Sequence, residues 1–212
     1  MKRSIGLIAA LFLSSNVFAA GALEINESPL TLVLNDHNQA LVSSCPDFIA
    51  LRKAGETVAE LPGLSDPDYR TAKDALFSCW LQAYIVKNGM TSTSGKAASL
   101  ADILKHFPAN AAYIVSNDEI ENVEKNFAGK SITDYTPDLK IDLERATSVS
   151  ASTGYLLDSD QSFTNHDGHT FRVIGLVGYS VGGTAANKVF WRVDDTSSPV
   201  WKVTRLDENS PI

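Results

Sequence analysis

The stretch SFTNHDGHTFRVIGLVGYS, residues 162–180, decides the fold class. It contains two runs typical of β-strands on either side of Asp167-Gly168, a dipeptide whose backbone suits a tight hairpin turn. Runs of the same kind follow at residues 190–193 and 200–206, with a polar turn between them. Upstream, apolar and charged residues alternate from Leu139, which indicates one more half-buried strand. An antiparallel sheet is therefore expected over about residues 139–206.

The part before this sheet, about residues 36–129, has helical periodicity. Its clearest helix is capped by Ser65 or Asp66, has Pro67 in the first turn and ends at Gly89. Apolar residues repeat along it at helical spacing: Tyr69, Ala72, Leu76, Trp80, Ala83 and Val86. This pattern predicts an amphipathic helix that packs against the rest of the domain.

Three other helices and one strand are expected in the same part. A helix begins at Cys45, with a proline in its first turn, and ends near Gly55. Ser99 and Ser116 each have an acidic residue three positions later, a capping pattern that starts a short helix. Leucines at alternate positions predict a short strand at residues 29–34.

The chain has two cysteines, Cys45 and Cys79, one in each of the two longer helices. In an oxidising compartment such a pair forms a disulfide, which would constrain the unfolded chain by roughly 3–4 kcal/mol. The alternative is a catalytic thiolate at Cys45, because the start of a helix lowers the pKa of a thiol. We expect the disulfide. The fold is then α+β, with N-terminal helices clamped by one disulfide and followed by a C-terminal antiparallel sheet.

The N-terminus is typical of a secretory signal. Basic residues precede an apolar run at residues 5–12, and small residues precede a cleavage point after Ala19 or, alternatively, after Ala22. Ser14 interrupts the apolar run too early for a membrane span, which needs about 20 apolar residues. We therefore expect a periplasmic or secreted protein, not inserted in the membrane, whose residues 20–212 form one composite domain.

The overall charge of the chain restricts the choice of partner. It has 18 basic and 25 acidic residues, a formal net charge of −7, and its basic residues are mostly scattered singly. Nucleic acid and anionic membranes require clustered lysine and arginine, so neither is an expected partner. A cationic protein suits this surface better.

Residues 178–182, GYSVG, match the G-x-S-x-G pattern. They resemble the nucleophile turn of α/β-hydrolases, and this local resemblance implies Ser180 as the nucleophile. In that family the catalytic histidine follows the serine, whereas all four histidines of this chain precede Ser180: His37, His106, His166 and His169. The sequence after the glycines also returns to a β pattern. A glycine-rich bend between antiparallel strands is the structure we expect here.

Two further motifs resemble a metal site and a phosphate-binding loop, but each lacks residues that such a site requires. His166 and His169 flank the hairpin turn, but the local sequence offers no third and fourth zinc ligand. Residues 129–131, Gly-Lys-Ser, lack the upstream glycine of a phosphate-binding loop and follow a helix, where that motif requires a strand. We therefore expect no metal site and no cofactor.

These exclusions favour a non-enzymatic binding protein of the periplasm. One form is an inhibitor or immunity protein that occupies the active site of another exported protein. The alternative is a hydrolase with Ser180 or Cys45 as its nucleophile. Trp191 shares its face of the sheet with apolar neighbours and is expected in the core. Contact with a protein partner is therefore expected on the acidic helix surface, at Glu119 and Glu121, and the oligomeric state stays open.

Overall fold

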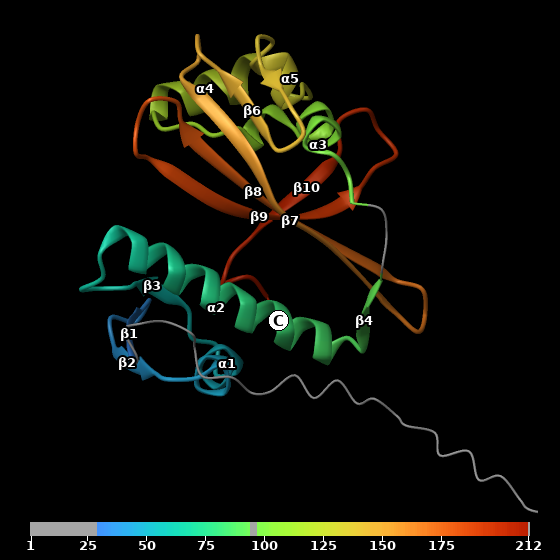
Figure 1. Ribbon diagram of the computed structural model, residues 1–212. Coiled ribbons are helices and arrows are strands. Elements are labelled where there is room, and N and C mark those ends of the chain that lie inside the picture. The colour runs from blue at the N-terminus through green and yellow to red at the C-terminus, as the bar shows by residue number, and fades with distance from the viewer. Residues whose placement is uncertain (1–28, 94–96, 212) are drawn as a thin grey trace, which may run out of the picture.

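The computed structural model describes residues 29–93 and 97–211. The expected signal, residues 1–19 or 1–22, lies outside the described residues. Within them the chain forms five α-helices, one short 3₁₀ helix and a large antiparallel sheet, with helices on both sides of the sheet (Figure 1). The α+β fold with helices before the sheet is thereby confirmed. None of the described helices has the length and apolar character that a membrane crossing requires.

The first layer combines a small sheet with two helices. Its members are β1 (Leu30–Leu34), β2 (Gln39–Val42), α1 (Cys45–Lys53), β3 (Val58–Glu60) and α2 (Asp66–Lys87). The three strands pair in the order β2-β1-β3. The strand at residues 29–34 and both helices were predicted, whereas β2 and β3 were not. These two strands are short and largely exposed, so they carry no clear hydrophobic pattern.

Helix α2 follows the sequence pattern closely. The Ser65 side chain accepts a hydrogen bond from the Asp68 backbone N–H, and Pro67 lies in the first turn. The helix ends before Gly89, whose φ of 58° lies in the left-handed region that favours glycine. Its buried residues are Ala72, Leu76, Phe77, Cys79 and Trp80.

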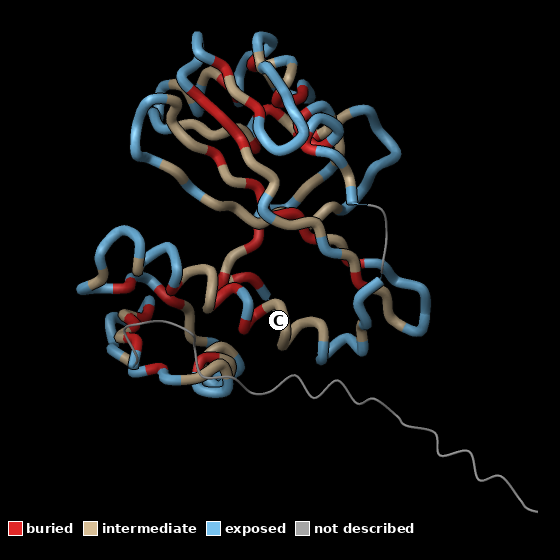
Figure 2. The backbone as a smooth tube through the Cα atoms, in the orientation of Figure 1, coloured by how far each residue is buried: buried red, intermediate tan, exposed pale blue. Residues whose placement is uncertain are grey.

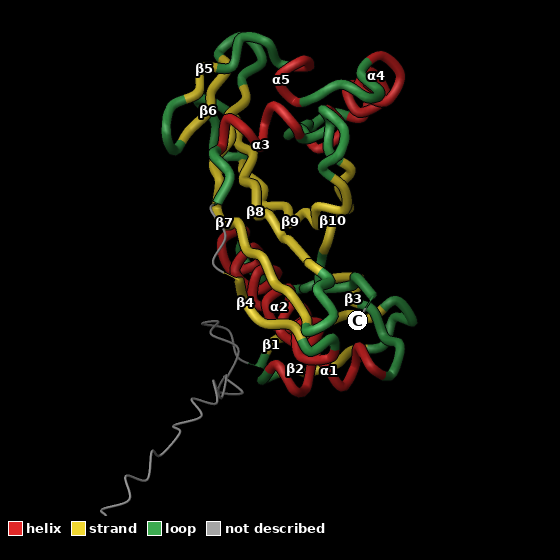
Figure 3. Tube along the Cα trace, turned by 90° about the vertical axis from the view of Figure 1, so that its right-hand side faces the viewer, coloured by secondary structure: helices red, strands yellow, loops and turns green. Residues whose placement is uncertain are grey.

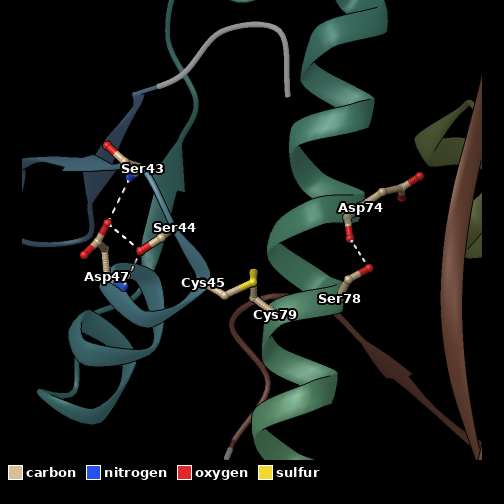
Figure 4. Close-up of a disulfide and its surroundings, with 7 residues drawn as sticks. All are labelled: Ser43, Ser44, Cys45, Asp47, Asp74, Ser78 and Cys79. Atoms are coloured by element: carbon tan, nitrogen blue, oxygen red, sulfur yellow. Dashed lines mark hydrogen bonds between the residues drawn. A yellow bond between two sulfur atoms is a disulfide. The ribbon is translucent and has the colours of Figure 1, made fainter. Parts of the chain in front are cut away.

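A disulfide joins the two helices, as predicted. Cys45 at the start of α1 is bonded to Cys79 in the middle of α2, with their Cα atoms 5.2 Å apart (Figure 4). Next to the bridge, Ser44 and Asp47 form the N-terminal cap of α1 through two hydrogen bonds. The bond thus closes a 34-residue separation that contains the whole of β3.

The second layer is the central seven-stranded sheet. Its strands are β4 (Met90–Thr93), β5 (Lys140–Ile141), β6 (Arg145–Ser148), β7 (Thr153–Asn165), β8 (Thr170–Ser180), β9 (Ala186–Asp195) and β10 (Lys202–Leu206). The order is β10-β9-β8-β7-β6-β5, and β4 pairs with the last residues of β7. The predicted hairpin at Asp167-Gly168 is the β7–β8 turn.

The strand expected from Leu139 is much shorter than its alternation indicates. Only Lys140 and Ile141 pair with β6, and Leu143 is 97% exposed. The Asp142 carboxylate accepts hydrogen bonds from the backbone N–H groups of residues 144 and 145, which turns the chain. The longer strand was therefore a wrong prediction, because local turn chemistry outweighs the hydrophobic pattern.

The third layer consists of α3 (Leu100–His106), η1 (Ala109–Ala111), α4 (Asn117–Asn126) and α5 (Ile132–Tyr135). As predicted, Ser99 and Ser116 cap α3 and α4, each accepting a backbone hydrogen bond from the residue three positions later. In Figures 1 and 3 these helices lie on one side of the strongly curved sheet, and α2 lies on the other.

Each side of the sheet has its own hydrophobic cluster, and buried segments line both junctions in Figure 2. The α2-side cluster includes Trp80, Phe163, Phe171 and Leu206. The α3-side cluster includes Phe107, Tyr155, Ile174 and Leu176. Along β8, Phe171 and Val173 belong to the α2-side cluster and Ile174 and Leu176 to the α3-side cluster, and the change of parity places the two pairs on opposite faces.

The segment after β10 returns to the first layer. The Arg52 guanidinium donates hydrogen bonds to the backbone carbonyls of Asn209 (2.7 Å) and Ser210 (3.1 Å). The Trp80 indole N–H donates to the same Ser210 carbonyl at 2.6 Å, and Asn209 pairs with the Val58 backbone through both its amide atoms. Residues 207–210 therefore supply several polar contacts on the α2 side.

Candidate functional site

A cleft of about 290 Å³ opens on the α3 side of the sheet, between α4 and strands β7–β10. We call it the helix–sheet cleft. Most of its wall is apolar or aromatic. It is lined by Asn110, Ala111, Ala112, Tyr113, Ile114, Ile120, Val123, Glu124, Tyr155, Leu176, Gly178, Asn187, Val189, Trp191 and Arg205.

Tyr113 forms one end of this cleft and is held there by two sheet residues, Tyr155 and Gly178. Its backbone N–H donates to the Tyr155 hydroxyl at 3.1 Å. Its side chain lies directly over Gly178, where an added Cβ would come 2.3 Å from the Tyr113 Cβ. Tyr155 is only 1% exposed, and this burial raises the pKa of its phenol. The end of the cleft is therefore a packed structure built into the core.

The sheet wall carries three polar groups without a partner. Asn187, Val189 and Trp191 occupy alternate positions of β9, so their side chains share one face. The Trp191 Nε1 atom is buried and has no hydrogen-bond partner among the described residues. Arg205 and Asn187 likewise make no side-chain hydrogen bond or ion pair within that part of the chain. Buried donors are ordinarily paired, and among the described residues the Trp191 N–H is an exception, as are the Arg52 Nε atom and the Tyr179 hydroxyl; of these three, only Trp191 lines the cleft.

The helix wall adds one carboxylate. Ile120 and Glu124 are four residues apart on α4, so they lie on the same side of the helix and both reach the cleft. Glu124 is exposed and forms no ion pair with any described residue. The cleft thus has an unpaired cation on the sheet and an unpaired anion on the helix.

A larger groove of about 450 Å³ on the opposite face makes a useful contrast. Its lysines are already paired: Lys188 contacts the carboxylates of Asp74 (2.8 Å) and Asp158 (3.0 Å), and Lys73 pairs with the buried Glu208. The groove also contains Arg70 and shares Arg205 with the cleft, and neither forms an ion pair with a described residue, so the contrast concerns its paired lysines alone.

The two predicted partner-binding residues have different environments. Glu121 is exposed on α4. Glu119 accepts hydrogen bonds from the Tyr135 hydroxyl (2.7 Å) and the Asn122 amide (3.0 Å), and these contacts lower the pKa of its carboxyl. Burial and the same contact with Glu119 raise the pKa of Tyr135. Glu119 is thus engaged within the molecule, and Glu121 is the freer charge.

Ser180 ends β8, and β9 begins six residues later in the antiparallel direction. The turn between them contains Gly182, whose φ is 77°. This is the predicted glycine-rich bend, not the strand-to-helix turn of a hydrolase. The Ser180 Oγ atom lies 3.4 Å from the Tyr113 hydroxyl, and no histidine of the described residues hydrogen-bonds to it. Cys45, the other candidate nucleophile, has no free thiol because of the disulfide.

The histidines lie at the surface or the edge of the α3-side cluster. His166 contacts only Asp167 in the exposed turn, at 3.0 Å. His106 ends α3, where its Nδ1 atom lies 2.6 Å from the Pro199 carbonyl and its ring stacks on Trp201. The described residues contain no group of three or more metal-ligating side chains.

Sequence reasoning did not identify the cleft. Trp191 was expected in the core, and it does pack against the α3-side cluster while also lining the cleft. The alternation of Asn187 with Trp191 was a usable signal, because it places a polar group on the face expected to be buried. Nothing in the sequence shows that Glu124 on α4 faces Arg205 on β10. Comparison with models of protein families, with curated proteins and with solved structures found no match for this chain.

Proposed function

We propose that this protein is an exported binding protein whose ligand lies in the helix–sheet cleft. The observation that carries the proposal is the buried, unpartnered Trp191 N–H beside Arg205 and Asn187, in a cleft that also has apolar and aromatic lining residues. Ligand sites commonly combine a mostly apolar lining with a few polar groups that orient the ligand. The signal-like N-terminus and the disulfide support export.

Two matched variants test this proposal. Val189 borders both the cleft and the groove, but it alternates with Trp191 along β9, so the added ring of Val189→Phe is on the cleft face; Val177→Phe adds the same volume to the groove. The mature protein and both variants are incubated with extract of the producing cell's envelope, recovered, and examined by native mass spectrometry. We expect a bound species with the unmodified protein and with Val177→Phe, and its loss with Val189→Phe. Identical results for all three proteins would contradict the proposal.

A second candidate is a protein partner, as an inhibitor or immunity protein has. Exposed apolar side chains favour it, because Ile120 and Val115 are 42% and 76% exposed next to the cleft, close to Glu121. Glu121→Lys is the clean test of a cationic partner, since reversing Glu119 would also break its contact with Tyr135. Slower association that is less sensitive to salt is the expected result for a partner recovered with the protein.

The hydrolase alternative has a direct test of its own. A fluorophosphonate probe that labels the mature protein stoichiometrically, with labelling abolished by Ser180→Ala, would establish a serine nucleophile. That result would contradict a non-enzymatic binding protein.

A further inference from the structure

The polar groups of the helix–sheet cleft have a definite arrangement. Trp191 and Arg205 are directly paired across β9 and β10, so their side chains leave the same face of the sheet next to each other. An indole N–H and a guanidinium side by side are two donors within reach of a single carboxylate. Asn187, four residues before Trp191, adds an amide on the same face.

Glu124 supplies the opposite charge from the opposite wall. It projects from α4, and Ile120 and Val123 of the same helix line the cleft beside it. A simple anion bound at Arg205 would be repelled by Glu124. A molecule that carries both charges satisfies Arg205 and Glu124 together.

We propose that the cleft binds a free α-amino acid with an apolar side chain, an inference that rests on the proposed function. The ligand carboxylate accepts hydrogen bonds from Arg205 and Trp191, and its ammonium donates to Glu124. Its side chain packs against the apolar wall that includes Leu176, Val189 and Ile120. The ligand thus pairs the groups that the protein leaves unpaired.

The test compares probes that share an apolar body and differ in charge. L-phenylalanine and L-leucine carry both charges, 3-phenylpropionate keeps only the carboxylate, and L-phenylalaninamide keeps only the ammonium. Isothermal titration calorimetry on the mature protein should give at least about tenfold tighter binding of the better amino acid than of either phenylalanine analogue. Phenylalaninamide also represents the N-terminal residue of a peptide, so it separates a peptide ligand from a free amino acid.

Single variants then assign each contact. Arg205→Met should weaken binding of L-phenylalanine and 3-phenylpropionate by about tenfold and leave phenylalaninamide unchanged. Glu124→Gln should weaken the amino acid and the amide, and strengthen the propionate. Trp191→Phe keeps an aromatic ring and removes the N–H donor. It should therefore weaken binding of the same two probes as Arg205→Met does, and leave phenylalaninamide unchanged. Lys202→Met on β10 and Asp118→Asn on α4 are matched controls from the same elements, and neither should change the affinity for any of the probes.

Three outcomes would overturn this inference. Equal binding of 3-phenylpropionate and L-phenylalanine would indicate a site for anions alone. Tighter binding of phenylalaninamide would indicate a peptide N-terminus. If neither amino acid binds while Val189→Phe still abolishes capture of the natural ligand, the amino-acid inference is wrong and the cleft function stands. If Val189→Phe has no effect on capture, the proposed function itself is wrong.

Discussion

The two faces of the central sheet differ in how the layers that cover them are held to the sheet. On the α2 side, a disulfide, the ion pairs of Lys73 and Lys188 and the contacts of residues 207–210 join the layers, although the buried Arg52 Nε atom has no hydrogen-bond partner among the described residues. On the α3 side, short helices cover the sheet without any cross-link, and Trp191, Arg205 and Glu124 stay unpaired beside an open cleft. The comparison separates a face that is cross-linked by a disulfide from the face on which we propose that a ligand binds.

The aromatic contacts follow the same division. Phe77 stacks on Phe190 with ring centroids 3.8 Å apart, closing α2 onto the sheet. On the other face, Phe107 meets Trp191 and Trp201 edge-on, with centroids 6.2 Å and 6.1 Å away. Phe107 is fully buried, so it is the main anchor of the α3 layer.

The largest expected effect comes from removing that anchor. Phe107→Ala deletes a fully buried ring and should lower the free energy of unfolding by about 3–5 kcal/mol. Chemical denaturation measures the loss, and hydrogen exchange locates it. Protection should fall in α3–α5 and persist in α2. Equal loss on both faces would show that the two layers open as one unit, which would break the comparison. Phe107→Leu is the milder control: it keeps an apolar side chain and removes less volume than Phe107→Ala, so its cost should be smaller.

Removing the cross-link should have the next largest effect. The double variant Cys45→Ala, Cys79→Ala loses the constraint on the unfolded chain, at a cost of about 2–5 kcal/mol. Here exchange should rise in α1 and α2, the reverse of the Phe107→Ala pattern. Thiol titration of the denatured, unreduced protein is the accompanying control. Two free thiols would show that the bond is absent and would return Cys45 as a candidate nucleophile.

Loosening residues 207–210 should cost less. Arg52→Met keeps the length of the side chain but leaves the carbonyls of residues 209 and 210 without their charged donor, at about 2 kcal/mol. The exposed neighbour Lys53 gives the matched variant Lys53→Met, which should be within about 0.5 kcal/mol of the unmodified protein. The melting temperatures of the two variants, measured by thermal unfolding under the same conditions, test this prediction. Equal melting temperatures would show that the 207–210 contacts contribute little.

The smallest expected effect is on the dependence of stability on pH, and it involves Asp160. Burial works against the charged form of Asp160, but its hydrogen bonds with Arg172 (2.7 and 2.8 Å) and the Ala98 backbone outweigh this and lower its pKa. A lowered pKa in the folded state stabilises the protein above the unfolded value of about 3.9, and the stabilisation is lost as pH falls through the folded pKa.

Asp160→Asn should therefore destabilise the protein near neutral pH and flatten the decline in stability below about pH 4. Urea unfolding between pH 3 and pH 7 measures both. Because Ala98 leads into α3, the acid-sensitive part of the exchange should lie on the α3 side. An unchanged pH profile would show that the Arg172 contact is not linked to folding.

Local signals made much of the fold predictable. The helix caps and the hairpin turn depend on residues only a few positions apart: Ser65, Ser99 and Ser116 for the caps and Asp167-Gly168 for the turn. The disulfide was predicted from the number of cysteines and the expected oxidising compartment. Strands β2 and β3 are too short and exposed to leave a periodic signal.

The cleft escaped prediction for a different reason. It depends on α4 facing β9 and β10 across the sheet, and the distance in sequence between Glu124 and Arg205 gives no indication of that approach. The sequence also left Glu119 and Glu121 equivalent. The contacts of the Tyr135 hydroxyl and the Asn122 amide with Glu119 distinguish them, because Glu121 stays at the surface.

The return of residues 207–210 to α1 and α2 has a consequence for biosynthesis. A chain made from its N-terminus presents Arg52, Val58 and Trp80 long before their partners at residues 209 and 210 exist. The α2 layer therefore cannot complete its hydrogen bonds before residues 209 and 210 have been synthesised, however early Cys45 and Cys79 are joined. Until then this layer is incompletely folded, and its contacts are of long range in sequence.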